Sequence, residues 1–401
     1  MAQRLKILLE SSPALAVHIK ELRMRNTDDG DDDQPVYRAS RGWLEDDASL
    51  PQILPRLTNL ERIYLAGSMS EALLEMSAVP SAVKTALFET WKSPKLTHIG
   101  FQCVQFASFK ELLSVVSECA AVQSITFFAV DVDDDFDFPA ELQSETQNHA
   151  QIINPADSDA SVSDSHPAGS SEPVQKPPSA GAVDKPQQAI ESLALFMEPE
   201  LSSRFCAWLL GPQSNLSLSS LQKFSLVAEL KDNLKVVHRV IQASTTLKEM
   251  NITIIAGDET YTVPFDISSL RVIHLGIDLA ADEPEQCQTT LNWWCDNLTS
   301  SSTLSLSHFN IYILTEYDGL VNFDYNQPAW ERLDGILSAD DCSIKLRVQI
   351  KCLEDEDNIG VPTKRTLEPE LLKKLEDKFP RMRDKSRLEV GQMRESIFSH
   401  L

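Results

Sequence analysis

The sequence predicts an α/β protein in which helices alternate with parallel strands, interrupted by one acidic insert. Three observations lead to this prediction. Short runs of alternating apolar residues recur along the chain, helix-like segments precede most of them, and a Ser/Pro/Asp-rich stretch divides the series. The chain has 401 residues, of which 42% are hydrophobic and 24% charged, so it carries enough apolar material for a sizeable core.

The strand-like runs share the form Φxx-Φ-x-Φ, where Φ is apolar. Their first residues are 23 to 41 positions apart, except for one gap of 99 that contains the insert. The eight clear instances are Ile19-Leu22-Met24, Leu60-Ile63-Leu65, Leu96-Ile99-Phe101, Val122-Ile125-Phe127, Leu221-Phe224-Leu226, Leu247-Met250-Ile252, Leu270-Ile273-Leu275 and Leu306-Phe309-Ile311. A degenerate ninth is Leu346-Val348-Ile350, and Leu388-Val390 is a candidate tenth.

The segments before these runs have apolar residues spaced near 3.6, as in amphipathic helices. They include RLKILLESSPALAVHI, SLPQILPRL, SAVKTALFETW, FKELLSVVSECA, LKVVHRVIQAS, TTLNWWCDNL, AWERLDGILSA and ELLKKLEDKF. Helix followed by strand, many times over, is the pattern of an α/β solenoid of the leucine-rich-repeat type. The array would be irregular, because its spacings are less even than the usual ones of about 20–29 residues and several are longer, and because the expected asparagine is mostly missing. A doubly wound sheet is the alternative, although no glycine-rich strand-to-helix turn appears.

Three regions follow from this reading: an N-terminal half of the solenoid at 1–130, a disordered insert at 131–188 and a C-terminal half at 189–401. The insert is rich in Ser, Pro, Ala and Asp and cannot bury enough apolar area to offset chain entropy. Residues 131–190 hold 12 acidic and 2 basic residues, and residues 27–35 add five aspartates. These two stretches carry most of the net charge of −24. The insert would be either a regulatory tail that competes for a basic partner or a passive spacer.

Several function classes are disfavoured by composition. A net charge of −24 argues against a nucleic-acid or anionic-membrane binder, and no apolar run is long enough for a transmembrane helix. The 13 glycines are never closer than 12 residues, so no phosphate-binding loop or nucleophile elbow is present. We therefore predict no cofactor, no metal ligands and no catalytic residues. Without a signal peptide, an odd number of thiols indicates a reduced cytoplasmic or nuclear location. The seven cysteines, which form no C-x-x-C motif and are expected in the core, are Cys103, Cys119, Cys206, Cys287, Cys295, Cys342 and Cys352.

A few local patterns admit two interpretations. Trp293-Trp294 could line a site, but their helical spacing with Cys295 favours the core. Residues 373–387 carry seven basic and three acidic residues and fit a solvated helix better than a nuclear-import signal. Ser161 with Asp164 is a weak acidic-directed phosphorylation pattern. The histidines are never closer than 17 residues, so no H-E-x-x-H motif exists.

Four segments carry a family resemblance: RLKILLESSPALAVHIKELRM, ILPRLTNLERIYL, PAWERLDGILSADDCSIKLRVQI and FPRMRDKSRLEV. They resemble the region after the F-box in fungal F-box proteins of the mushroom-forming lineage. RLKILLESSPALAVHIKELRM is similar to the segment that opens this region, and ILPRLTNLERIYL to its next unit. PAWERLDGILSADDCSIKLRVQI, with Trp330, Leu333-Asp334 and Leu337, resembles the near-terminal unit, and FPRMRDKSRLEV the closing one. The F-box itself, an N-terminal helical module that usually opens with Leu-Pro, is not seen.

The resemblance implies the part of such proteins that holds a substrate. The leading expectation is a non-enzymatic protein–protein interaction module with an unknown protein partner. One alternative is a substrate receptor of a cullin–RING ubiquitin ligase, which would bind the Skp adaptor and cullin complex. A second alternative is a cryptic α/β enzyme.

Overall fold

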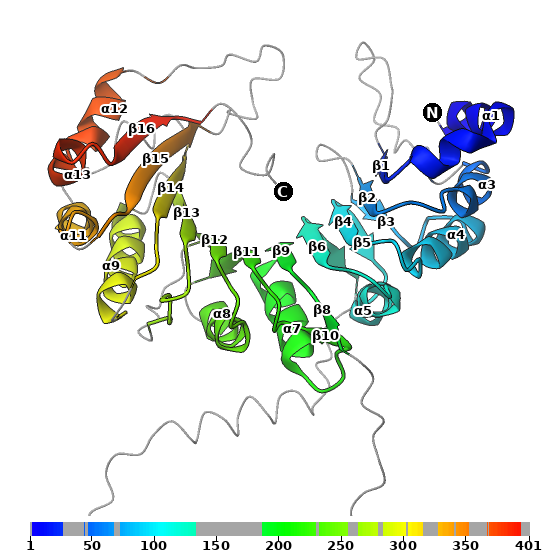
Figure 1. Ribbon diagram of the computed structural model, residues 1–401, viewed down its shortest axis with the longest axis horizontal. Helices are drawn as coiled ribbons and strands as arrows, with labels where there is room; N and C mark the ends of the chain where they lie inside the picture. Colours follow the sequence, from blue (N-terminus) through cyan, green and yellow to red (C-terminus); the bar gives the residue numbers. More distant parts are fainter. Residues whose placement is uncertain are drawn as a thin grey trace, which may run out of the picture.

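The protein is described by a computed structural model. Its described residues are 2–26, 44, 47–67, 73–133, 187–229, 232–255, 264–279, 284–301, 304–315, 328–340, 342–352, 367 and 369–393. The dominant feature is one curved sheet of 11 strands, all parallel to their neighbours and ordered as in the sequence (Figure 1). Its strands are β1 (Glu21–Arg25), β2 (Arg62–Ala66), β4 (His98–Gln102), β6 (Ser124–Phe128), β9 (Ser192–Phe196), β11 (Lys223–Glu229), β12 (Glu249–Ile255), β13 (Val272–Leu279), β14 (His308–Thr315), β15 (Lys345–Cys352) and β16 (Leu388–Gln392).

Helices line the outer side of the curve, and the strands line its inner side (Figure 1). The helices are α1 (Ala2–Ser11), α3 (Leu50–Ile53), α4 (Ser81–Trp91), α5 (Phe109–Glu118), α7 (Pro199–Leu210), α8 (Asp232–Ala243), α9 (Pro284–Ser300), α11 (Pro328–Leu337), α12 (Pro369–Glu376) and α13 (Pro380–Asp384), with 3-10 turns η1 (Pro13–His18) and η2 (Leu54–Arg56). Parallel strands need such crossover connections, because a hairpin cannot join them. Among the described elements, none of the helices covers the inner face.

The apolar positions of the strand pattern form continuous rows along the sheet. The second Φ of every strand pairs in register with that of the next, and the third Φ does the same. The second-Φ row is Leu22, Ile63, Ile99, Ile125, Leu193, Phe224, Met250, Ile273, Phe309, Leu346 and Leu388. Most of this row is fully buried against the helices, so the strand period of two sets which face is apolar.

The backbone at the start of eight strands of the large sheet, from β2 to β14, repeats one hydrogen-bonding pattern. The N–H groups of Glu61 and Arg62 both donate to the carbonyl of Lys20, at 2.8 and 3.0 Å. Those of Thr97 and His98 donate in the same way to the carbonyl of Glu61, at 2.9 and 3.1 Å. Because each of these strands begins on a carbonyl just before its predecessor, the contact helps to fix the register of the ladder.

The sheet passes without interruption across the point where the insert divides the sequence. Strand β6 pairs directly with β9 over five residues. Behind this pair, the Phe127 ring meets the Phe205 ring edge to face, with centroids 5.2 Å apart. Phe127 also contacts Phe101, which in turn packs against Trp91, so one aromatic stack joins the two sides. The two halves therefore share one core.

The sequence predictions for the strands are confirmed, with one omission. All ten proposed runs form strands of the large sheet. The missed strand is β9, whose Ile190, Leu193 and Leu195 fit the same pattern but directly follow the insert. Helix α7 behind it was missed for the same reason. The doubly wound alternative is wrong, because the strand order never reverses.

The ends of the expected insert are part of the folded structure. Short strand β7 (Asp131–Val132) lies within 131–188 and β8 (Gln188–Ala189) begins at its last residue, while residues 134–186 lie outside the described part of the chain. Strand β7 closes a small parallel sheet with β3 (Leu74–Glu75) and β5 (Val104–Phe106), and β8 pairs with β10 (Leu216–Ser217). These small sheets were not predicted. Across the described residues, we find no helix with the length and apolarity needed to cross a membrane.

Candidate functional site

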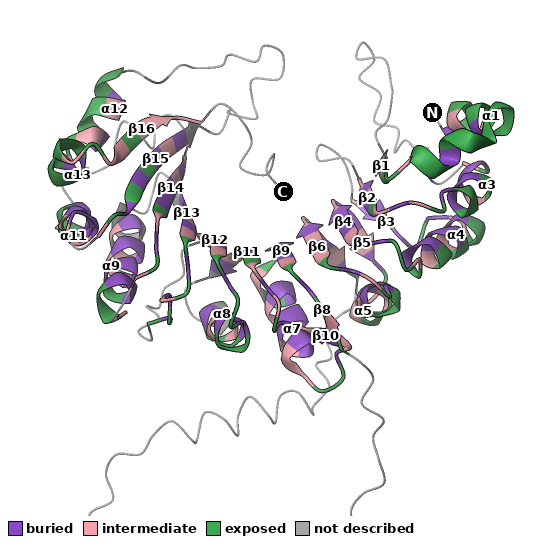
Figure 2. Ribbon diagram, viewed as in Figure 1, coloured by how far each residue is buried: buried purple, intermediate pink, exposed green. Residues whose placement is uncertain are grey.

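The inner face of the large sheet is the main candidate site, and we call it the open face. It carries the strand residues that alternate with the two buried apolar rows (Figure 2). Its middle row is paired from one edge of the sheet to the other. That row comprises Arg23, Tyr64, Gly100, Thr126, Ala194, Ser225, Asn251, His274, Asn310, Arg347 and Glu389.

The open face differs in charge from the chain as a whole. In its middle row and the two rows flanking it, basic side chains outnumber acidic ones, although the chain has a net charge of −24. The basic ones are Arg23, Arg25, Arg62, Lys223, Lys345 and Arg347, and the acidic ones are Glu21, Glu249 and Glu389. Each of the three glutamates is within ion-pair distance of a basic neighbour on the same face.

Arginines gather where the open face begins, on β1 and β2. We call Arg23, Arg25 and Arg62 the basic end. Glu21 lies between two of them: its Oε1 is 2.6 Å from Arg23 Nε, and its Oε2 is 3.7 Å from Arg62 Nη1. One carboxylate thus bridges two of the three guanidinium groups, those of Arg23 and Arg62. Since their side chains are exposed, each pair contributes little to stability.

A tyrosine ring lies flat on the sheet beside the basic end. Tyr64 pairs with Gly100 across β2 and β4, and a Cβ atom built on Gly100 would collide with Tyr64 Cδ1 and lie 2.8 Å from Cε1. The glycine therefore leaves the space that the ring occupies. On the other side, the Arg23 guanidinium lies 5.2 Å from the centroid of the same ring. Tyr64 presents an aromatic surface within reach of a ligand held by the arginines.

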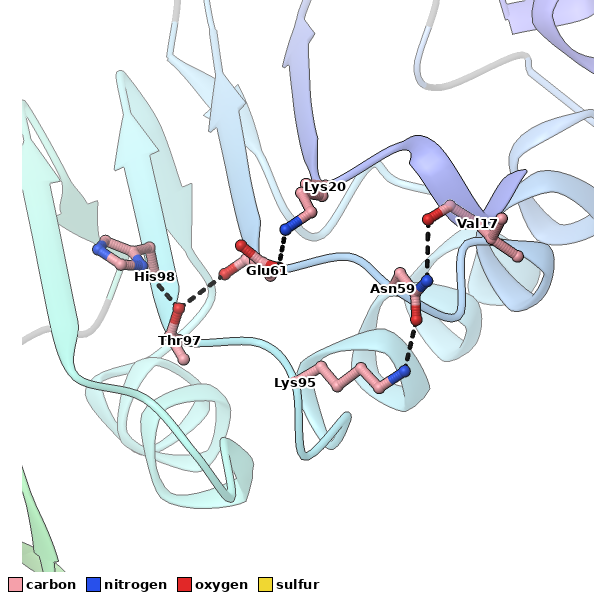
Figure 3. A network of polar contacts seen from close by, with 7 residues as sticks. All are labelled: Val17, Lys20, Asn59, Glu61, Lys95, Thr97 and His98. Carbon is pink, nitrogen blue, oxygen red and sulfur yellow. Dashed lines mark hydrogen bonds and ion pairs between the residues drawn. The ribbon is translucent and has the colours of Figure 1, made fainter. Parts of the chain in front are cut away.

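A polar network holds the strand starts next to the basic end (Figure 3). Lys20 Nζ is 2.7 Å from Glu61 Oε1, and this hydrogen bond lowers the pKa of Glu61. Thr97 Oγ1 donates to the Glu61 carbonyl at 3.2 Å and lies 2.8 Å from His98 Nδ1. Burial, reinforced by the Arg62 charge, lowers the pKa of His98. At neutral pH this histidine adds no charge to the face.

Asn59 ties together the turns that precede three strands (Figure 3). Its Nδ2 donates to the Val17 carbonyl at 2.8 Å, and its Oδ1 accepts from Lys95 Nζ. Asparagine suits this role, because one amide both donates and accepts. The contact fixes η1 against the turns before β2 and β4.

The opposite half of the open face holds a cluster centred on His274. The Tyr312 hydroxyl lies 3.0 Å from His274 Nδ1, and the Asn310 amide nitrogen lies 3.3 Å from the same atom. Since an amide nitrogen can only donate, Nδ1 is the accepting nitrogen and the ring proton is on Nε2. That nitrogen is 3.6 Å from Glu249 Oε1, and Lys223 Nζ is 3.0 Å from Oε2.

Electrostatics make this cluster a fixed arrangement of donors and acceptors. The contact of His274 Nε2 with the carboxylate at 3.6 Å, aided by Lys223, lowers the pKa of Glu249 to about 2. Burial raises the pKa of Tyr312, so its hydroxyl keeps its proton at neutral pH. The Tyr312 and His274 rings are nearly parallel, at 8°. The cluster can offer a carboxylate, a phenol and an amide to a partner.

The structure places the two tryptophans and most of the cysteines considered from sequence in the core. Trp293 and Trp294 are 6% and 0% exposed, which confirms the core interpretation. His98, His274 and His308 lie on strands and His238 on α8, and none of the four is fully buried. The described cysteines are unbridged, and all but Cys342 are buried. Burial raises the pKa values of Cys119 and Cys206 to about 12.

Two sequence patterns have different outcomes. The basic segment 373–387 forms α12, α13 and the turn after them, with Arg383 and Lys385 paired to Asp377 and Asp340. Ser161 and Asp164 lie outside the described residues. Within the described part of the chain, no group of three His, Cys, Asp or Glu side chains is placed to hold a metal ion.

Sequence reasoning did not identify the open-face clusters. Tyr64 and His274 occupy x positions of the strand pattern, and Tyr312 directly follows it. One sequence cannot rank such positions. Comparison with known proteins adds no assignment: no family model matches the sequence, and neither does any curated protein.

Proposed function

We propose that this chain is a non-enzymatic protein-recognition module: a solenoid of the leucine-rich-repeat type that binds a protein partner on its open face. One observation carries the proposal. Eleven parallel strands follow one another in sequence order and leave one face without a helix among the described elements. Repeat arrays of this kind use such extended curved surfaces for binding.

The side chains of the open face support this role. Besides small residues, this face carries arginines, tyrosines and histidines. Arginine and tyrosine are the residues enriched at the centres of protein interfaces. Many of these side chains are held by neighbours, as Tyr64 is by Gly100 and Arg23. Ordering them when a partner binds would therefore cost little conformational entropy.

The test is a native pull-down from cytoplasmic and nuclear fractions with three charge-matched variants. Two alter the open face, Arg23→Glu/Arg62→Glu and Lys345→Glu/Arg347→Glu. The third, Lys373→Glu/Lys374→Glu, makes the same change on exposed residues of α12. We expect proteins enriched by the wild type to be lost with at least one open-face variant and kept with the α12 variant. Capture that is unaffected by either open-face variant would refute the proposal.

The same experiment addresses the ubiquitin-ligase alternative. Enrichment of the Skp adaptor and a cullin would make the chain a ligase substrate receptor, and the open face would then be its substrate side. Their absence, with other proteins enriched through the open face, would leave a free-standing interaction module.

A further inference from the structure

We infer that the N-terminal end of the array binds a second copy of this chain, through α1 helices that pack antiparallel about a two-fold axis. This contact goes beyond the proposed function, because α1 and η1 lie at the end of the curve, on its helical side, and leave the open face to a partner (Figure 1). Three features of the described residues support it: a cluster of exposed apolar side chains, the charges around that cluster, and the character of the opposite end of the array.

Exposed large apolar side chains gather in one place. Among the described residues they all lie on α1 and η1, and they are Ile7, Leu8, Leu15 and Val17, between 40% and 56% exposed. One exposed apolar side chain needs no explanation, whereas a cluster of them marks a binding surface. Val17 also lines an open hollow of about 540 Å³, which has room for an apolar side chain of a partner. The rest of its lining is Leu9, Glu10, Pro13, Ala16 and Arg56.

The cluster is exposed because α1 is the first helix of the array. Helix α4 packs between α3 and α5, whereas α1 has α3 on one side and the end of the array on the other (Figure 1). Ala2 and Leu9 of α1 are buried, while Ile7 and Leu8 on its other side are exposed. Terminal units of a repeat array need a polar outer face in water, so the apolar face of α1 needs a cover.

The side chains around the cluster favour a two-fold antiparallel pair. Arg4, Ile7 and Leu8 are exposed on one face of α1, at spacings of three and four residues. An antiparallel pair centred between Ile7 and Leu8 places each Ile7 on the Leu8 of the other copy. It also places each Arg4 beside the other copy's Glu10, which Lys6 Nζ approaches only to 3.9 Å. A parallel pair would instead bring the two Arg4 side chains together.

The opposite end of the array does not match the apolar end. The exposed charged side chains of α12 and α13 are Glu370, Lys373, Lys374, Arg381, Arg383 and Asp384. Stacking the N-terminal end of one copy on this end of the next would remove these charges from water without partners, which costs free energy. A two-fold contact between two N-terminal ends buries apolar surface on both sides and closes as a dimer.

The test is sedimentation velocity of the full chain from about 1 to about 300 µM, in about 0.15 M salt to screen its net charge of −24. We expect a monomer–dimer equilibrium with a Kd on the order of 10–100 µM, because the contact is small. Ile7→Gln/Leu8→Gln keeps good helix formers and should weaken the dimer at least about tenfold. The control Lys345→Glu/Arg347→Glu, on the open face, should change the Kd less than about twofold. Circular dichroism checks that each variant is folded.

A charge exchange tests the antiparallel arrangement separately. Arg4→Glu and Glu10→Arg should each weaken the dimer about fivefold, because each sets like charges opposite one another twice in the interface. The double variant Arg4→Glu/Glu10→Arg inverts the pair and should return the Kd to within about twofold of the wild type.

Four results would overturn the inference. A chain that stays monomeric at the highest concentration has no such contact, even if Ile7→Gln/Leu8→Gln then loses a different protein in a pull-down. A dimer that is insensitive to Ile7→Gln/Leu8→Gln forms elsewhere on the chain. Species that keep growing with concentration would show head-to-tail stacking. A dimer that the double charge variant fails to restore would contradict the antiparallel pair.

Discussion

Asp334 gives the sharpest test of how the C-terminal end of the fold is held together. Its side chain is 2% exposed and reaches from α11 to the backbone at the start of α13. Oδ2 accepts from the Arg381 N–H at 3.1 Å and Oδ1 from the Met382 N–H at 3.0 Å. In Asp334→Ala, both N–H groups lose an ionised acceptor, and Met382 is fully buried. Hydrogen bonds to charged groups contribute about 1.5–3 kcal/mol each, less the desolvation of the carboxylate, so we expect a loss of about 3 kcal/mol.

The assay combines urea unfolding with amide hydrogen exchange. A loss of about 3 kcal/mol should speed exchange of the Arg381 and Met382 amides by about a hundredfold. Asp334→Asn keeps one acceptor without its charge and should lie between the wild type and Asp334→Ala. The control is Glu331→Ala, which removes an exposed carboxylate from the same helix. If Asp334→Ala behaves like Glu331→Ala, the capping role assigned to Asp334 is wrong.

Three further predictions concern the sheet and the core. Gly276→Ala should destabilise the chain by about 1–3 kcal/mol in thermal unfolding, because the new Cβ would lie 3.0 Å from Cβ and Cγ2 of β-branched Thr253. Gly391→Ala, in the same row with nothing within 4 Å, should change stability little, and equal costs would contradict the steric argument. The pKa of Glu249 is lowered from 4.5 to about 2 on folding, so its stabilisation is present above pH 4.5 and lost as the pH falls toward 2. Glu249→Gln should therefore flatten the decline of unfolding free energy over that window, and an unchanged slope would count against the His274 contact. At pH 8, a thiol reagent should leave the most deeply buried cysteines unmodified until the chain is unfolded; these are Cys119, Cys206, Cys287 and Cys295.

The strands could be predicted from sequence because burial on one face imposes a period of two. Ile63 and Leu65 alternate with polar residues, and so do their counterparts in nine other runs. Strand β9 has the same period of two. It was not predicted because the Ser/Pro/Asp-rich composition of the preceding residues indicated disorder. The small sheet of β3, β5 and β7 could not be predicted, because two- or three-residue strands carry no measurable period.

The near-terminal segment around Trp330 packs against the closing segment around Phe379. Trp330 packs edge to face on Phe379 with ring centroids 5.5 Å apart, and Asp334 caps the helix that contains Met382. The two segments that were compared separately are therefore in direct contact. A sequence alone shows that Trp330 and Asp334 share one face of a helix, but not what they contact.

The open-face clusters were beyond sequence reasoning for a different reason. Tyr64 meets Arg23 and Gly100 only because three strands, separated by about 40 residues each, stack in register. His274 meets Glu249, Asn310 and Tyr312 in the same way. The x positions become neighbours through the fold, and only their polarity is visible in the sequence.

The central claim is that a protein partner binds the open face. Hydroxyl-radical footprinting of the chain, alone and with its most enriched pull-down partner, tests it directly by measuring side-chain accessibility. We predict that oxidation of Tyr64, His274 and Tyr312 falls on complex formation, while that of Ile7 and Leu8, 56% and 48% exposed on α1, is unchanged. Protection confined to α1 or to other helices, with the open face as reactive as before, would contradict the account.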